Sequence, residues 1–273
     1  MNGFKTVIAS AALGALALCS GSGLANAGSV TQPGETVGAS LGGPLPEGLY
    51  GVDTGSVGQR GTANEGVNIP VLLWSTPLAL GGVRIETIAA LPAVYVGTSK
   101  TNTAASTFAG GMYNPFAGVI AAYDFGGGFG ASYLAGAYFP MTGGDFGNAF
   151  NEYTFRQDIH LTYTTNGWTA NANLIYGMVG KNQASHIANP DYFNYDLSLT
   201  KTLGKWEVGP VAFGSTDVSS PAGHAAQSQF AIGGLVGYNF GPVIAQTYIT
   251  TDVAETHYGA RETRGWIRLI LPL

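Results

Sequence analysis

Residues 153–179 read YTFRQDIHLTYTTNGWTANANLIYGMV and alternate between apolar and polar side chains on both sides of a tight turn. The apolar positions of the first arm are Tyr153, Phe155, Ile159, Leu161 and Tyr163. After the turn signal Thr165-Asn166-Gly167, the apolar positions are Trp168, Ala170, Ala172, Leu174, Tyr176 and Met178. Successive strand side chains point to opposite faces, so the pattern predicts a hairpin with one apolar face. Each arm has about a dozen residues, which suits a tilted strand crossing a bilayer.

The same alternation recurs along the chain and predicts about twelve strands. Their expected ranges are 48–59, 67–77, 83–98, 116–125, 129–141, 153–164, 168–179, 191–203, 206–216, 228–240, 243–252 and 261–273. In the hairpin around Gly126-Gly127-Gly128, the side chains expected to face outward are Val119, Tyr123, Phe125, Phe129, Tyr133 and Phe139. Asp53 and Asp124 have no partner that the sequence reveals.

Short and long connections alternate between these strands. Short turns are expected near residues 81, 127, 166, 204 and 241, and longer loops at 61–66, 99–114, 142–152, 181–190, 217–227 and 253–260. This order is typical of outer-membrane barrels, which have short periplasmic turns and longer outer loops. We therefore predict an all-β fold, a closed antiparallel transmembrane β-barrel with both termini on the periplasmic side. A soluble β-sandwich or a lipocalin-like barrel is the alternative.

The N-terminus carries the features of an export signal. A short basic stretch ends at Lys5, a small and apolar stretch follows, and Ala25-Asn26-Ala27 is a small-x-small cleavage site. Residues 1–27 are therefore expected to be a cleaved signal peptide and residues 28–273 the barrel. Cys19 lies within the signal, so the mature chain would have no disulfide and no thiol nucleophile. Residues 28–47 are expected to be an irregular extension, with 28–45 on the periplasmic side.

The composition fits a protein surrounded by lipid. Only 10% of the residues are charged, 42 are Gly, 14 are Tyr and 13 are Phe. The formal net charge is −5 and no basic run occurs, which argues against nucleic-acid binding. No apolar run after the signal is long enough for a membrane helix, so a spanning chain must close into a barrel. The expected partners are membrane lipid and lipopolysaccharide, the barrel-assembly machinery during biogenesis, and a small solute.

The final strand supports assembly as an outer-membrane barrel. Ile267, Leu269, Leu271 and Leu273 alternate with Trp266, Arg268 and Ile270. Such a C-terminal strand resembles the signal that the assembly machinery reads, although that signal usually ends in an aromatic residue and this chain ends in Leu273.

If the apolar face is outside, the polar face lines the lumen. The candidate lumen and solute-pathway residues are Arg84, Glu86, Arg156, Asp158, His160, Asn171, Asn173, Asn194, Asp196, Glu207, Gln246, Arg264 and Arg268. Buried charges must be paired or hydrated. These side chains therefore form either a mutually satisfied polar filling that holds the barrel in shape, or a constriction that selects solutes. The two interpretations are compatible.

Other site chemistries find little support. Outer-membrane phospholipases use a Ser–His–Asn arrangement, but Ser198 and His160 lie two strands apart and no Gly-x-Ser-x-Gly motif occurs. The four histidines are isolated, so the sequence predicts no metal site. Gly126-Gly127-Gly128-Phe129-Gly130 joins two strands and precedes no helix, so it is interpreted as a turn rather than a phosphate loop. No catalytic residue and no cofactor are predicted.

Several segments resemble a known family. They are residues 189–197 (NPDYFNYDL), 205–210 (KWEVGP), 215–217 (STD) and 46–50 (PEGLY). Together they make the chain similar to the meta-pathway phenol-degradation family. The resemblance implies an exported outer-membrane β-barrel, often encoded near aromatic-degradation functions and regarded as a transporter of hydrophobic or aromatic compounds. It supplies no catalytic residues, and its phenol label implies a substrate class only by association.

These observations predict a porin-like channel in the bacterial outer membrane. Its function would be passive uptake of small molecules, including hydrophobic or aromatic, phenol-like compounds. Loops 99–114, 142–152 and 217–227 would form its mouth. Two alternatives remain: a structural barrel with a plugged lumen, and an outer-membrane lipase or esterase.

Overall fold

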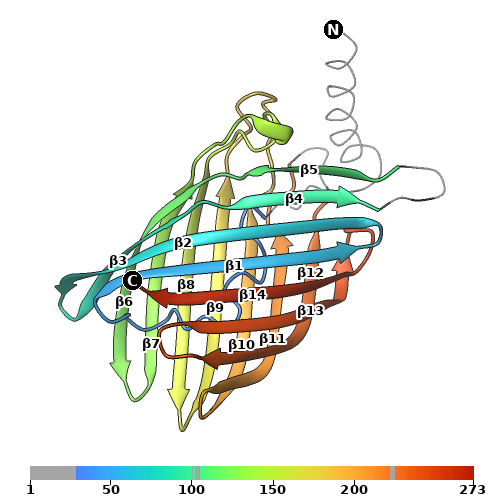
Figure 1. Ribbon diagram of the computed structural model, residues 1–273. Helices are drawn as coiled ribbons and strands as arrows, with labels where there is room; N and C mark the ends of the chain where they lie inside the picture. The colour runs from blue at the N-terminus through green and yellow to red at the C-terminus, as the bar shows by residue number, and fades with distance from the viewer. Residues whose placement is uncertain (1–28, 100, 102–104, 222–224) are drawn as a thin grey trace.

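The computed structural model describes residues 29–99, 101, 105–221 and 225–273, which form an antiparallel β-barrel (Figure 1). The strands are β1 (Gly48–Arg60), β2 (Ala63–Leu80), β3 (Val83–Ala90), β4 (Ala93–Thr98), β5 (Thr107–Met112), β6 (Phe116–Gly126), β7 (Phe129–Tyr138), β8 (Thr154–Thr165), β9 (Trp168–Val179), β10 (Tyr192–Leu203), β11 (Trp206–Asp217), β12 (Ser228–Asn239), β13 (Ile244–Thr256) and β14 (Glu262–Pro272). The predicted signal peptide, residues 1–27, lies outside the described residues.

Twelve of these strands make the closed barrel, as predicted. Their order around the wall is β1, β14 to β6 in descending order, β3 and β2, and β1 pairs with both β14 and β2 to close the circle. β4 and β5 are an additional hairpin that continues the sheet from β2. Closure pairs the backbone of the first and last strands, which an open sheet in lipid would leave unsatisfied.

The hairpin of residues 153–179 is confirmed. β8 and β9 pair without a register shift from Thr154 opposite Val179 to Thr165 opposite Trp168. Their turn places Asn166 at φ 49° and Gly167 at φ 75°, a left-handed conformation that Asn and Gly tolerate best. The short turns at 81, 127, 166, 204 and 241 share one end of the barrel, here called the turn end. The opposite end is the loop end.

Three expected boundaries near the loop end were wrong. Strand 83–98 is divided into β3 and β4 at Leu91 and Pro92, because proline has no N–H to donate to the ladder. The expected loop 99–114 contains β5, which pairs with β4 from Thr107 to Met112. The expected loop 61–66 is mostly strand, since β2 begins at Ala63.

The outer face of the barrel is apolar. All six side chains that were expected to face outward in the β6–β7 hairpin are exposed: Val119, Tyr123, Phe125, Phe129, Tyr133 and Phe139. The polar residues of the alternating strands are instead buried inside, as Asp158 and Asn173 illustrate. A wall that is apolar outside and polar inside is the arrangement expected of a barrel in lipid.

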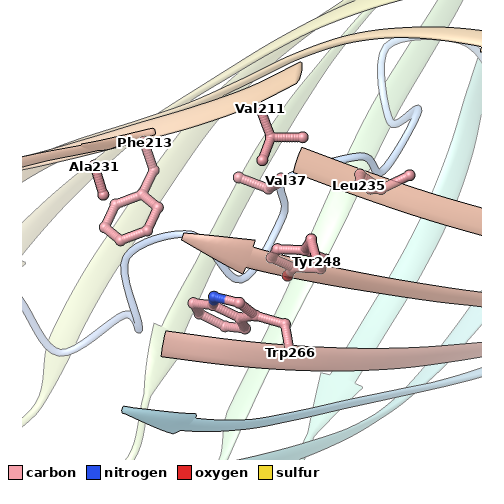
Figure 2. Packing of buried hydrophobic residues seen from close by; sticks show 7 residues of the cluster. All are labelled: Val37, Val211, Phe213, Ala231, Leu235, Tyr248 and Trp266. Carbon is pink, nitrogen blue, oxygen red and sulfur yellow. The ribbon is translucent and has the colours of Figure 1, made fainter. Parts of the chain in front are cut away.

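Residues 29–47, here called the inner segment, lie inside the barrel and not beyond its periplasmic rim as expected for 28–45 (Figure 1). Val37 is fully buried in a cluster with Val211, Phe213, Ala231, Leu235, Tyr248 and Trp266, which project toward it from the surrounding strands (Figure 2). A second apolar cluster around Phe116 and Tyr138 packs against Val30 and Leu45. The segment is irregular, as predicted, but it forms part of the core.

Helix is nearly absent from the described part of the chain. The 3-10 helix η1 (Gly144–Phe146) lies in the loop between β7 and β8. Among the residues described, no helix has both the length and the apolar character needed to cross a membrane.

Candidate functional site

The inner segment runs the height of the lumen. At the loop end, the Thr31 hydroxyl bonds with the hydroxyls of Tyr138 (3.1 Å) and Tyr192 (2.7 Å), which stand at the ends of β7 and β10. At the turn end, the backbone N–H of Leu45 donates to Glu86 at 2.8 Å. The segment then continues directly into β1.

Asp196 on β10 binds a turn of the inner segment. Its carboxylate accepts from the backbone N–H groups of Gly34 (3.0 Å) and Thr36 (2.8 Å) and from the Thr36 hydroxyl (2.7 Å). Gly34 has φ 89°, and a Cβ there would lie 2.8 Å from the Phe213 ring. Glycine at this position therefore permits both the turn and its close approach to the wall.

Arg268 on β14 binds the opposite side of the same turn. Its guanidinium donates to the carbonyl oxygens of Glu35 and Val37, the latter at 2.7 Å. It also bonds Thr54, Gln246 and Tyr248. A guanidinium has five N–H donors and no acceptor, so this buried cation is well satisfied by neutral oxygens. Asp196 and Arg268 together hold the backbone donors and acceptors of one turn.

A third anchor is an ion-pair cluster on β8. Arg156 pairs with Asp158 (2.7 Å), two residues along the same strand, and with Glu35 of the inner segment (2.6 Å). The neighbouring His160 lies 3.1 Å from Asn173, whose amide donates to the carbonyl of Thr36 at 3.0 Å. The cluster thus links two wall strands to the inner segment through charged and neutral hydrogen bonds.

The predicted lumen residues divide into two groups. Those with a hydrogen bond or ion pair to the inner segment are Arg84, Glu86, Arg156, Asn173, Asn194, Asp196, Gln246 and Arg268. Those bonded only to the wall in the described structure are Asp158, His160, Asn171, Glu207 and Arg264. That any of them borders a solute path remains a prediction.

Arg264 belongs to a separate network near the loop end. It bonds Glu262 (2.7 Å) and Ser56 (2.9 Å), and Arg60 pairs with Asp252 (3.1 Å). Arg84, by contrast, sits near the turn end, where it pairs with the exposed Glu47 at 2.7 Å. The sequence predicted that Arg84, Arg264 and Arg268 all line the lumen. In the structure each has a different set of partners: Glu47 at the turn end, the network near the loop end, and the turn of the inner segment, respectively.

Sequence reasoning missed the contribution of the inner segment itself. Thr31, Glu35 and Thr36 lie in a stretch rich in Gly, Pro, Ser and Thr, where no strand or helix period marks a buried position. Tyr138 and Tyr192 were assigned to strands without a site role, although both are buried and hydrogen-bonded to Thr31. The alternation alone placed them on the inner face and could have drawn attention to them.

Three prolines lie near one line across the wall: Pro70 within β2, Pro92 between β3 and β4, and Pro115 just before β6. Pro70, Pro92 and Pro115 each accept a backbone hydrogen bond, from Leu91 (3.1 Å), Tyr113 (2.8 Å) and Phe139 (2.9 Å) respectively. None of the three can donate one in return, so the ladder loses donors along one line. β3 and β4 separate at this line, as do β5 and β6.

An apolar groove of about 460 Å³ lies where the ladder is interrupted. Its lining residues are Pro70, Val71, Leu72, Ala89, Ala90, Leu91, Pro115 and Phe116. Leu72 is an exposed residue of the outer face, whereas Phe116 is buried, with its ring 4.8 Å from the Tyr138 ring and tilted by 49° to it, beside the inner segment. The groove therefore reaches from the lipid-facing surface into the thickness of the wall.

The loop between β7 and β8 covers the free edge of β5. Asp145 accepts from the Gly110 backbone N–H at 3.0 Å, and Asn114 donates to the Glu152 carbonyl at 3.1 Å. Burial raises the pKa of the Glu152 carboxyl, and a hydrogen bond from Asn182 opposes that shift. This loop completes the wall above β7 with side chains in place of strand pairing.

The described residues offer neither a metal centre nor a paired nucleophile. No group of three or more His, Cys, Asp or Glu residues in this part of the chain could hold a metal ion. Ser198 accepts from Asn171 at 3.1 Å, whereas His160 bonds Asn173 and approaches Asp158. The Ser198–His160 pair considered for a lipase is not hydrogen-bonded in the described structure.

A protein-family model matches residues 32–269 of the chain. The matching family carries the description "Putative MetA-pathway of phenol degradation". The chain belongs to this family. The family resemblance inferred from the sequence is thus confirmed. A comparison with curated protein sequences gave no match.

Solved structures similar to this member of the phenol-degradation family are outer-membrane barrels. The COG4313 outer membrane channel from Pseudomonas putida F1 superposes with a TM-score of 0.72 at 13% identity, covering 87% of this chain and 100% of the other. The NanC porin gives 0.51 at 10% identity, covering 82% and 100%. The β-domain of the Bordetella autotransporter BrkA gives 0.50 at 13% identity, covering 83% and 99%. At these identities the likeness establishes the fold.

The family membership and the fold together place this protein in the bacterial outer membrane, as predicted. It is a barrel of the channel and porin type, in contact with membrane lipid. The COG4313 structure is named as a channel and NanC as a porin, and neither of these two proteins is an enzyme.

Proposed function

We propose that this protein allows small apolar molecules, including aromatic ones, to cross the outer membrane down their concentration gradient. The family description connects the chain with phenol degradation, and this connection supports aromatic compounds as the substrate class. No nucleotide, metal or other cofactor takes part in this proposal.

The observation that carries the proposal is the contrast between the lumen and the wall groove. Asp196, Arg268 and Asn173 are buried and already bonded to the inner segment, so a polar solute would have to displace that segment to bind them. The groove is lined entirely by apolar residues, and its size falls in the range of roughly 300–1,000 Å³ typical of small-molecule sites. The resting barrel therefore suits apolar solutes better than ions or sugars.

The predicted lumen residues take a specific role in this proposal. The residues bonded to the inner segment hold it inside the lumen and thereby narrow the path along the barrel axis. The residues bonded only to the wall hold the strands around it. The lumen is thus a polar filling and a constriction at once, which unites the two interpretations left open by the sequence.

Transport can be tested in vesicles with a lipopolysaccharide outer leaflet. Entry of labelled phenol and labelled arabinose would be compared between vesicles containing the full chain and vesicles without protein. We expect faster phenol entry and unchanged arabinose entry. Equal acceleration of both solutes would indicate a general porin, and no acceleration of phenol would refute the proposal.

The structural barrel is the second candidate, and the inner segment is the observation that favours it. A lumen held by three buried anchors could serve only to stabilise the wall. A variant lacking residues 29–45 distinguishes the two candidates in the same vesicles. If phenol entry requires the protein but not these residues, transport is supported. If neither form accelerates phenol entry, the structural role is favoured.

A further inference from the structure

Asp53 is a carboxylate on the lipid-facing surface of β1. Its side chain is exposed, and its register places it between Leu269 of β14 and Pro70 of β2. Along β14, the outward neighbours of Leu269 are the apolar Ile267 and Leu271. Asp53 therefore lies within the apolar belt of the barrel and not at a hydrated rim.

An ionisable side chain that faces lipid is costly and rarely without a function. Asn68 of β2 donates to Oδ1 of Asp53 at 2.8 Å. No other hydrogen bond to Asp53 occurs in the described part of the chain, so its second carboxylate oxygen remains open as an acceptor. The residues two positions before and after Asp53 are Gly51 and Gly55, which leave it unshielded on that face.

This carboxylate adjoins the apolar groove. Pro70 is the direct cross-strand partner of Asp53 and also lines the groove, as does Leu72 on the same outward face. Directly opposed side chains of an antiparallel pair have Cβ atoms roughly 4.5–5.5 Å apart. An acceptor oxygen and an apolar cavity thus lie within the reach of one small molecule.

We propose that Asp53 and the groove form a binding site for small aromatic molecules that carry a hydroxyl group. The ring occupies the groove between Leu72, Leu91 and Pro115, and the solute O–H donates to Asp53. Asn68 is a positioning residue, because its amide fixes the orientation of the carboxylate. The site gives this lipid-facing carboxylate a role: the ligand hydroxyl donates the hydrogen bond that water would donate to an aspartate at a hydrated surface.

This inference rests on the proposed transport of apolar solutes and sharpens it to hydroxylated aromatics. The competing occupant is a second copy of the chain. The Asp53 and Asn68 pair is self-complementary, so two copies related by a two-fold axis could exchange hydrogen bonds. A lipid-facing polar pair covered by another barrel would be bound to protein and not to solute.

The test measures binding of 4-fluorophenol and of fluorobenzene by fluorine NMR to the full chain in lipid nanodiscs, with empty nanodiscs as the partition reference. The two probes differ by the hydroxyl group alone. A hydrogen bond to a charged group changes affinity by roughly tenfold or more. We expect the native chain to prefer 4-fluorophenol by about that factor.

Asp53→Leu should abolish this preference while leaving fluorobenzene binding unchanged. It removes a charge from the lipid face, so the barrel should fold at least as well as the native one. Asn68→Ala should reduce the preference partially. Asp124→Asn is the matched control, because Asp124 is an exposed carboxylate that caps the Gly126 N–H at the turn end, away from the groove. It should keep the native preference.

Equal binding of the two probes, or a preference that survives Asp53→Leu, would overturn the site. A native dimer in light scattering that becomes a monomer in Asp53→Leu would assign the pair to a second copy instead. If the preference is present but phenol entry into vesicles is not accelerated, the site stands as a binding site and the transport proposal alone fails.

Discussion

The two walls of this barrel are built differently. Strands β8 to β14 are 11 to 13 residues long and pair along nearly their whole length. On the other side, β2 has 18 residues, β3 has 8, and β4 and β5 have 6 each. The aligned prolines lie on this second wall. We call the two the regular wall and the interrupted wall.

The difference shows how one barrel can bind a segment in its lumen and still offer a solute a groove where backbone pairing in the wall is interrupted. The regular wall supplies Asn173, Asp196 and Arg268, which bind the backbone of the inner segment. The interrupted wall supplies the apolar groove, at strands whose ladder lacks donors. The regular wall pairs continuously and supplies the contacts to Glu35, Thr36 and Val37, whereas the interrupted wall combines lost pairing with the apolar groove and contacts the segment at Leu45 through Glu86.

The largest expected effect follows from removing Arg268. Arg268→Met leaves the buried carbonyls of Glu35 and Val37 without their donor, and each unsatisfied buried acceptor costs roughly 1–3 kcal/mol. We expect the free energy of unfolding to fall by about 3 kcal/mol or more, and ion conductance to rise as the inner segment loosens. Urea unfolding in detergent and planar-bilayer recording measure the two effects.

Arg264→Met is the matched control for that substitution. Arg264 is equally buried, but it bonds Glu262 and Ser56 of the wall and has no hydrogen bond or ion pair to the inner segment in the described part of the chain. It should lower stability without raising conductance. If both variants conduct alike, the inner segment is not held by Arg268 and the contrast between anchoring and wall residues is wrong.

A smaller effect is expected from Glu35→Gln. The amide keeps a hydrogen-bond acceptor for Arg156 but loses the charge, and Asp158 still compensates the guanidinium. A charge-assisted bond exceeds a neutral one by about 1 kcal/mol, so stability should fall by about that amount. Brief single-channel openings should become more frequent. A loss as large as that of Arg268→Met would mean that the ion pair is the principal anchor.

The interrupted wall is tested by filling its groove. Leu72→Trp places a larger side chain on the outward lip, where it faces lipid and should leave stability within about 0.5 kcal/mol of the native value. Phenol entry into vesicles should fall several-fold. Val119→Trp is the control, since Val119 is similarly exposed on β6 but does not line the groove. Equal transport by the two variants would remove the groove from the pathway.

The regular wall was predictable from sequence because one period governs it. In β8 and β9, polar side chains recur every second residue and Asn166-Gly167 marks the turn. The hairpin, and the face of the sheet on which each side chain lies, could therefore be derived from the sequence. The interrupted wall was harder, since Pro92 and Pro115 indicate a break but do not reveal that the chain resumes pairing beyond it. In that region strand pairing depends on β2, which is long enough to pair with both β3 and β4.

The inner segment could not be predicted, for a different reason. Its contacts join residues far apart in sequence, such as Thr31 with Tyr192 and Glu35 with Arg156. Nothing periodic in residues 29–47 indicates which of them are buried. Asp196 and Arg268, two of the predicted lumen residues, are buried, and both bond backbone groups of a segment that was expected outside the barrel.

The smallest effect is expected at the turn-end rim of the barrel, where Arg84 lies. Arg84 pairs with Glu47, but the Glu47 carboxylate is more than half exposed, and exposed ion pairs contribute about 0–1 kcal/mol. Arg84→Ala should therefore change stability by less than about 1 kcal/mol and leave conductance unaltered. The measurement is again urea unfolding, with bilayer recording beside it. Because Glu47 is where the inner segment joins β1, a large rise in conductance would show that the segment is retained at its C-terminal end, and that the buried anchors of the regular wall only position it.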